Sequence, residues 1–242
     1  CIIKTSQQKV LMAKKQYFLI VDVETTITDK VADFGAVICD RKGIIAAQCA
    51  VMVNDVYGVD PLYYNEQAGE LWTKQSLAIR MARYNDMLVS GARMLASVSA
   101  INRWLEKACG KYDPELTAYN LPFDVSKCAN TNIDLNMFSR RFCLWAASVG
   151  NICNTKGFKE FVLQNHRFNN PTDKGNMTFK TDAETVTGYL SGKMTDEPHT
   201  SLEDIIGYEL PTLVHILKKK KWRENITPYA WSQHQVKDHF KA

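Results

Sequence analysis

The chain has 242 residues, of which 45% are hydrophobic and 23% are charged, and its formal net charge is +4. No apolar run approaches the roughly 20 residues that a membrane-spanning helix needs, and the N-terminus is too polar for a secretory signal, so no membrane partner is expected. The seven cysteines are scattered without a Cys-x-x-Cys pair. This spacing argues against a zinc ribbon or a disulfide framework and favours a cytoplasmic location.

The length predicts one sizeable domain with short extensions. Met12 is the first methionine, so we expect residues 1–11 to be either an upstream extension or residues added to the natural chain. The folded domain is expected over residues 12–221 and a C-terminal tail over residues 222–242. The mildly basic charge is compatible with a nucleic-acid partner but does not identify one.

The first half of the chain predicts three strands followed by a long helix. Residues 17–21 form an apolar run that continues into Asp22 and Glu24, and further apolar runs cover residues 31–39 and 44–53. Short turns join them, one of them at Gly43, so the three strands should form an antiparallel meander. Residues 54–69 are expected to be a loop, and residues 70–109 a helix that ends at Gly110.

The second half predicts an alternation of short strands and helices. Strands are expected at 116–119 and 141–146, with a helix from Asp124 through Cys128 between them. Helices are also expected at 157–164, 181–190 and 200–217, and a loop at 165–180. Capping boxes should open the helices at Thr181 and Thr200, and Pro211 should kink or break the last one. The whole pattern predicts an α/β fold, with a mixed sheet flanked by helices.

Asp22 and Glu24 lie two residues apart at the end of the first strand. Side chains alternate between the faces of a strand, so these two carboxylates should share one face, roughly 7 Å apart. Unpaired carboxylates on one buried face repel each other, and a divalent cation would relieve the repulsion. The alternative is an exposed strand end with two solvated acids.

Three further titratable residues follow strands or begin helices. Asp124 comes just after a predicted strand, His199 lies just before the last helix, and Asp204 lies one turn inside it. An imidazole and a carboxylate should therefore meet at one helix end. The structural alternatives are a helix N-cap for Asp124, a favourable helix-dipole contact for Asp204, and an ordinary loop histidine for His199.

These residues form three motifs in order: Asp22-Val-Glu-Thr-Thr26, Ala118-Tyr-Asn-Leu-Pro-Phe-Asp124 and His199-Thr-Ser-Leu-Glu-Asp204. In their order and spacing they resemble the DEDDh exonucleases, which include the proofreading subunit of bacterial DNA polymerase III, ribonuclease T and oligoribonuclease. The resemblance covers roughly residues 16–217 and implies a ribonuclease H-like fold. Two positions depart from the family pattern: Ile27 replaces a common glycine and Ser201 a common alanine.

The resemblance implies 3′→5′ hydrolysis of phosphodiester bonds with two Mg²⁺ or Mn²⁺ ions as cofactors. By this resemblance Asp22 would bridge both ions, Glu24 and Asp204 would complete the site of the nucleophile, and Asp124 would hold the second ion. His199 would act as the general base, because an ordinary histidine pKa of about 6.5 suits that role near neutral pH.

The expected partner is single-stranded or 3′-end nucleic acid, with DNA favoured over RNA. Thr25, Thr26, Asn120 and Phe123 are the candidate substrate-binding residues. Thr25 and Thr26 are expected to contact the terminal nucleotide. Asn120 is expected to hold backbone or a neighbouring side chain, and Phe123 to lie in the core rather than stack on a base. Other readings remain open: a proofreading subunit that docks on a polymerase through residues 222–242, a homodimer, or a catalytically silent nucleic-acid-binding module.

Overall fold

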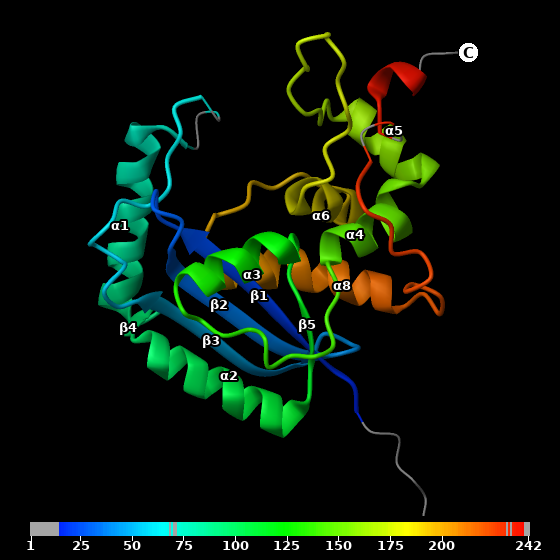
Figure 1. The fold of residues 1–242 in the computed structure, drawn as a ribbon. Helices are drawn as coiled ribbons and strands as arrows, with labels where there is room; N and C mark the ends of the chain where they lie inside the picture. The colour runs from blue at the N-terminus through cyan, green and yellow to red at the C-terminus, as the bar shows by residue number, and fades with distance from the viewer. Residues whose placement is uncertain (1–14, 68, 70–71, 231, 233, 240–242) are drawn as a thin grey trace, which may run out of the picture.

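The structure, a computed structural model, describes residues 15–67, 69, 72–230, 232 and 234–239. A five-stranded mixed sheet runs through its centre (Figure 1). The strands are β1 (Tyr17–Thr25), β2 (Val31–Asp40), β3 (Ile45–Val53), β4 (Met94–Ala96) and β5 (Glu115–Thr117), in the spatial order β4-β3-β2-β1-β5. The first three are antiparallel, while β5 pairs parallel to β1 and β4 parallel to β3. The predicted meander and the mixed sheet are therefore confirmed.

Helices cover both faces of this sheet (Figure 1). The α-helices are α1 (Lys74–Ser90), α2 (Val98–Tyr112), α3 (Leu121–Asn130), α4 (Leu144–Ser148), α5 (Lys156–Gln164), α6 (Ala183–Ser191), α7 (Ser201–Asp204) and α8 (Leu210–Leu217). A π-helical segment, η2 (Val149–Cys153), follows α4, and a second, η3 (Ile205–Glu209), joins α7 to α8. A 3₁₀ segment, η5 (Val236–His239), lies near the C-terminus.

The alternation of side chains along β1 divides the core into two parts. Leu19 and Val21 are fully buried on the face covered by α1, α2 and α3. Phe18 and Ile20 are fully buried on the opposite face, against the helices from α4 to α8. Since β1 has a two-residue period, Asp22 and Glu24 continue the row of Phe18 and Ile20. Both carboxylates therefore point toward the face on which α7 lies.

The long helix predicted over residues 70–109 is wrong. Residues 70 and 71 lie outside the described part of the chain, and the rest forms α1, a turn, β4 and α2. Gly91 ends α1 with a φ of 77°, a conformation that glycine adopts without strain. Arg93 then turns into the core, where it is 2% exposed. The second helix also passes the predicted stop at Gly110 and ends at Tyr112, where Asp113 takes the left-handed conformation.

Two other predicted boundaries in the middle of the chain are wrong. The helix expected from Asp124 begins at Leu121, because Asn120 is the N-cap and Pro122 fits the first turn, which needs no proline N–H. The strand expected at 141–146 is reduced to one bridge between Leu116 and Arg141, after which α4 begins. The helix at 157–164 and the loops at 54–69 and 165–180 are confirmed for the described residues.

Neither predicted capping box forms as expected. Asp182, not Thr181, caps α6 by accepting a hydrogen bond from Thr185 N at 2.9 Å. At the start of α7 the Thr200 N–H donates to Asp204 Oδ2 at 2.8 Å rather than to Glu203, because Glu203 pairs with Arg93 instead. The break predicted at Pro211 is present: the α-helix is interrupted by η3, and Pro211 occupies the first turn of α8 directly after it.

The described part of the C-terminal tail packs on the domain. Trp222 is 3% exposed and contacts Phe142 with 4.8 Å between ring centroids. Tyr229 stacks on Trp145 at 5.4 Å. Among the described residues, no helix combines the length and apolar character required to span a bilayer.

Candidate metal centre

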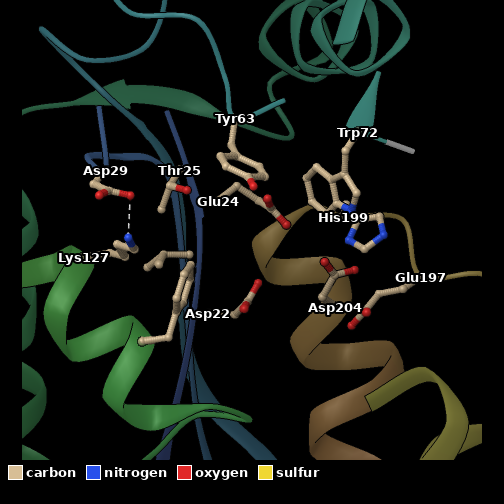
Figure 2. A pocket seen from close by; sticks show the side chains of 12 residues that line it. Asp22, Glu24, Thr25, Asp29, Tyr63, Trp72, Lys127, Glu197, His199 and Asp204 are labelled. Carbon is tan, nitrogen blue, oxygen red and sulfur yellow. Dashed lines mark hydrogen bonds and ion pairs between the residues drawn. The ribbon is translucent and has the colours of Figure 1, made fainter. Parts of the chain in front are cut away.

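A pocket of about 480 Å³ opens where β1 ends, between α3 on one side and the segment leading into α7 on the other (Figure 2). It is lined by Asp22, Val23, Glu24, Thr25, Asp29, Tyr63, Trp72, Phe123, Lys127, Glu197, His199 and Asp204. Four of the five residues predicted to be catalytic thus line a single pocket. The fifth, Asp124, is 3% exposed in the first turn of α3.

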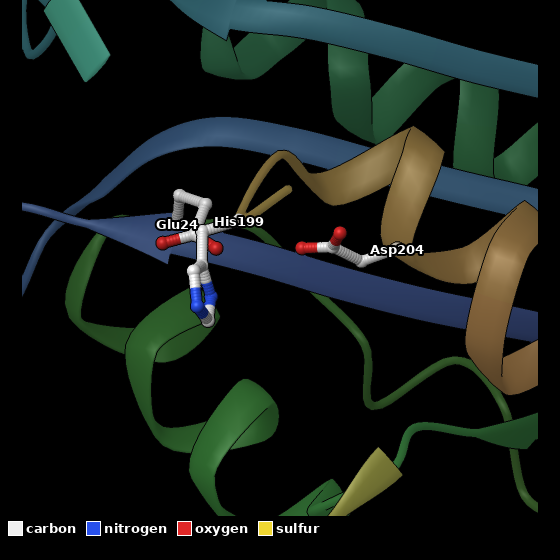
Figure 3. Close-up of side chains that lie close together, drawn as sticks. All are labelled: Glu24, His199 and Asp204. Carbon is white, nitrogen blue, oxygen red and sulfur yellow. The ribbon is translucent and has the colours of Figure 1, made fainter. Parts of the chain in front are cut away.

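Glu24, His199 and Asp204 form the tightest group in this pocket (Figure 3). One ligand atom from each, two carboxylate oxygens and one imidazole nitrogen, lies within 4.8 Å of the other two. Glu24 comes from β1, whereas His199 directly precedes the N-cap of α7 and Asp204 is the last residue of that helix. The predicted meeting of an imidazole and a carboxylate, those of His199 and Asp204, is confirmed, and Glu24 joins them.

The buried acids carry oxygen atoms without partners, as a cation site requires. Asp22 Oδ2 and Asp204 Oδ1 are both buried and accept no hydrogen bond from the described residues. The other oxygen of Asp204 accepts from Thr200 N at 2.8 Å, which fixes the carboxylate. A buried carboxylate oxygen left without a partner is costly, and hard divalent cations prefer oxygen ligands. The donor set therefore suits a hard divalent cation.

The raised pKa values of the acids in and beside the pocket also favour a bound cation. Burial, followed by the charge of Asp33, raises the pKa of Asp22 to about 7. Burial, followed by the charge of Asp22, raises the pKa of Asp204 to about 10 and holds those of Glu24 and Asp124 well above the usual range. The negative charges of the four carboxylates thus repel one another, so a nearby positive charge would favour their ionised forms.

His199 is held in an unusual backbone conformation by contacts with α1 and the loop before it. Its φ is 54°, which is uncommon for a residue with a side chain. Tyr84 Oη donates to the His199 carbonyl at 3.3 Å, and the Trp72 ring lies 5.1 Å from the imidazole. Burial, followed by the charge of Arg80, lowers the pKa of His199. The imidazole is therefore neutral near pH 7 and can accept a proton.

A buried ion network fixes α7, the helix that carries Asp204. Arg93 Nε donates to Asp33 Oδ1 at 3.0 Å, and both side chains are fully buried. The same guanidinium donates to Glu203 Oε2 at 2.5 Å and Oε1 at 3.2 Å. Asp33 Oδ2 in turn accepts from Ser201 N at 3.0 Å. The turn after α1 and strand β2 thereby hold both the backbone and one side chain of α7.

The residues predicted to contact substrate are divided. Thr25 and Phe123 line the pocket, and Phe123 is 43% exposed, so the expectation that it lies in the core is wrong. Thr26 is fully buried and turns away from the pocket, because its hydroxyl bonds with Thr28 Oγ1 at 2.9 Å within the turn. Asn120 lines a different cavity, on the other side of the start of α3.

Several residues that line the pocket were not predicted from the sequence. Glu197 stands two positions before His199, and its pKa rises to about 8 because of burial and then the charge of Asp22. Its position two residues before His199 is the one feature of the sequence that could have indicated that Glu197 belongs to the pocket. Tyr63 and Trp72 come from the loop before α1, and Lys127 comes from α3. Nothing in the sequence indicates that these three side chains reach the end of β1.

The residues that line the pocket thus come from β1, α3, α7 and the loop before α1 (Figure 2). Comparison of the chain with protein-family models, with curated proteins and with solved structures found no match in any of the three.

Proposed function

We propose that the chain is a metal-dependent 3′→5′ exonuclease with a ribonuclease H-like fold, related to the DEDDh exonucleases. The observation that carries the proposal is the convergence of Glu24, His199 and Asp204 within 4.8 Å of one another at the end of β1. Asp22 lines the same pocket, and Asp124 is buried close enough to Asp22 for its pKa to be raised by that charge. The substrate is nucleic acid with a free 3′ end, and DNA is favoured over RNA.

Asp22, Glu24, Asp124 and Asp204 would hold two Mg²⁺ or Mn²⁺ ions. When bound, such ions lower the pKa of coordinated water and neutralise charge on the phosphate. The remaining chemistry belongs to side chains of this chain. His199, neutral near pH 7, accepts the proton of the attacking water at an imidazole nitrogen. Tyr84 and Trp72 keep the imidazole facing Glu24 and Asp204.

The walls of the pocket suit the 3′ end of a nucleic-acid strand. Its volume, about 480 Å³, lies within the range of small-ligand sites. Tyr63 and Phe123 supply aromatic surface on which a terminal base can stack, and Lys127 supplies a positive charge for a phosphate. Lys127 Nζ already pairs with Asp29 at 2.5 Å, so a phosphate would compete with that carboxylate. The retention of all four acids argues against a catalytically silent module.

A digestion panel tests the proposal. The purified chain is incubated with 5′-labelled and 3′-labelled DNA and RNA, single- and double-stranded, in Mg²⁺ or Mn²⁺. A 3′→5′ exonuclease releases a 3′ label at once as a mononucleotide and shortens a 5′-labelled strand one nucleotide at a time. EDTA and Asp204→Asn should abolish both, and His199→Ala should lower kcat by about 10²–10⁴-fold.

The matched control is Asp86→Asn, which removes one carboxylate from the exposed surface of α1. It should leave digestion unchanged. Activity that survives both EDTA and Asp204→Asn, or that Asp86→Asn removes equally, contradicts the proposal.

A further inference from the structure

A second cavity lies next to the metal centre, on the other side of the start of α3. It encloses about 490 Å³ and is lined by Tyr119, Asn120, Trp145, Asn169, Asn170, Thr181, Asp182 and Tyr229. Asn120 lines this cavity, whereas Phe123, three residues later, lines the pocket of the metal centre. One turn of backbone therefore separates the two, and a flexible ligand can reach from one to the other.

Aromatic rings form a fixed surface in this cavity. Trp145 stacks on Tyr229 with an interplanar angle of 23°, and Tyr229 stacks on His234 at the same angle with centroids 4.6 Å apart. Trp145 Nε1 donates to Thr181 Oγ1 at 2.9 Å, and Tyr119 Oη donates to the Thr181 carbonyl at 2.5 Å. These bonds hold Trp145 and Tyr119 in place, so a planar ligand that stacks on Trp145 would meet a ring that needs no reorganisation.

The polar groups of the cavity suit a neutral heterocycle better than an ion. Asp182 is the only charged residue among the described residues that line it, and its carboxylate caps α6 and lies within 3.9 Å of Arg167 and Lys180. Asn120 makes no side-chain bond to the first turn of α3. Its amide, like that of the exposed Asn170, offers a donor and an acceptor to the edge of a ring.

We propose that this cavity binds a nucleobase of a single-stranded nucleic acid whose 3′ nucleotide lies in the metal centre. The inference rests on the proposed function for the position of the 3′ end. The base stacks on the Trp145 ring, because Tyr229 already stacks on both Trp145 and His234, and the amides of Asn120 and Asn170 meet its edge. The strand crosses the start of α3 between the two cavities. The substrate is therefore a single strand of more than one nucleotide, because a paired base could not enter the cavity.

Binding without turnover tests the inference. The full chain in EDTA is titrated with a 5′-fluorescein tetranucleotide of DNA and with four versions of it, each carrying one abasic residue, and anisotropy gives Kd. One abasic residue other than the 3′-terminal one should weaken binding by about 5- to 150-fold, the value expected for one stacked base. Trp145→Leu should weaken binding of the intact oligonucleotide to a similar extent and leave binding of that abasic version unchanged.

Two further variants separate binding from folding. Asn170→Ala changes only an exposed amide and should weaken the intact oligonucleotide more than the abasic one. Trp104→Leu replaces a half-buried tryptophan of α2 and should affect neither. The inference is overturned if both Trp145→Leu and Asn170→Ala weaken binding of the intact and the abasic oligonucleotide equally. It is also overturned if neither variant weakens binding of the intact oligonucleotide.

The proposed function and the base site can fail separately. A chain that shows the abasic-dependent binding but digests no nucleic acid refutes the exonuclease and keeps the base site. A chain that digests 3′ ends but binds all internal abasic versions like the intact oligonucleotide refutes the base site alone.

Discussion

Arg93 is expected to be the residue outside the pocket on which the metal centre most depends. The change Arg93→Met removes the guanidinium and leaves Asp33, which is fully buried, without its cationic partner, while the Ser201 N–H still donates to it at 3.0 Å. Breaking a buried pair from one side costs about 3–5 kcal/mol. For a domain of this size each kcal/mol lowers Tm by about 2–4 °C, so Tm should fall by about 6–20 °C.

The same change should disturb catalysis beyond its effect on stability. Arg93 holds Glu203, and Asp33 holds Ser201 N, so both anchor the short helix between His199 and Asp204. A displacement of about 1 Å in a catalytic group costs about 10²-fold in rate. We therefore expect kcat to fall by about that factor at temperatures well below the lowered Tm, with KM for the oligonucleotide nearly unchanged.

Calorimetry and single-turnover digestion measure the two effects. Arg93→Lys keeps the charge but loses the fork that reaches two carboxylates, so it should recover Tm more than kcat. Arg103→Met, on the exposed surface of α2, is the matched control and should change neither. The reasoning is refuted if Arg93→Met keeps the wild-type Tm, or if its lost activity merely equals the fraction of unfolded protein.

Three more predictions concern the packing, the charges and the walls of the metal centre. Gly35→Ala would place a Cβ 2.7 Å from Ser201 C, so it should cost about 1–3 kcal/mol and lower kcat by displacing α7. Burial raises the pKa of Asp22 from 3.8 to about 7 and the pKa of Asp204 from 3.8 to about 10. From pH 3.8 up to these raised values, the folded metal-free protein therefore binds more protons than the unfolded chain. Its Tm should fall as pH rises through this range, and Mn²⁺ should raise Tm more at about pH 8 than at about pH 5. Phe123→Ala should raise KM for the oligonucleotide and leave Tm nearly unchanged, because the side chain is 43% exposed.

Each of these has a result that contradicts it. Gly110→Ala, where no atom lies within 4 Å of the added Cβ, is the control for Gly35→Ala and should raise stability by about 0.5–1 kcal/mol. Equal behaviour of the two variants would show that α7 does not press on β2. A metal-free Tm that rises with pH would contradict the charge repulsion. An unchanged KM in Phe123→Ala would place the substrate away from that wall.

Local patterns were enough to predict the sheet meander and the main acids that line the pocket at the end of β1. The first three strands agree with their predicted boundaries to within one residue or so, because apolar runs and the turn at Gly43 act over a few residues. The shared face of Asp22 and Glu24 follows from the two-residue period of a strand. The pairing of His199 with Asp204 follows from their spacing at a helix end, since five residues leave the two side chains little freedom to separate.

The main features of the pocket that the sequence did not reveal depend on residues distant in the chain. The break between α1 and α2 is secured by Arg93, whose partners Asp33 and Glu203 lie 60 and 110 residues away. The aromatic wall of the pocket depends on how the loop before α1 folds back to His199. Periodicity along one segment carries no information about such partners. The acids and their common face were thus determined by the sequence alone, whereas the pocket around them was decided by tertiary packing, because only packing brings β1, α1, α3 and α7 to one place.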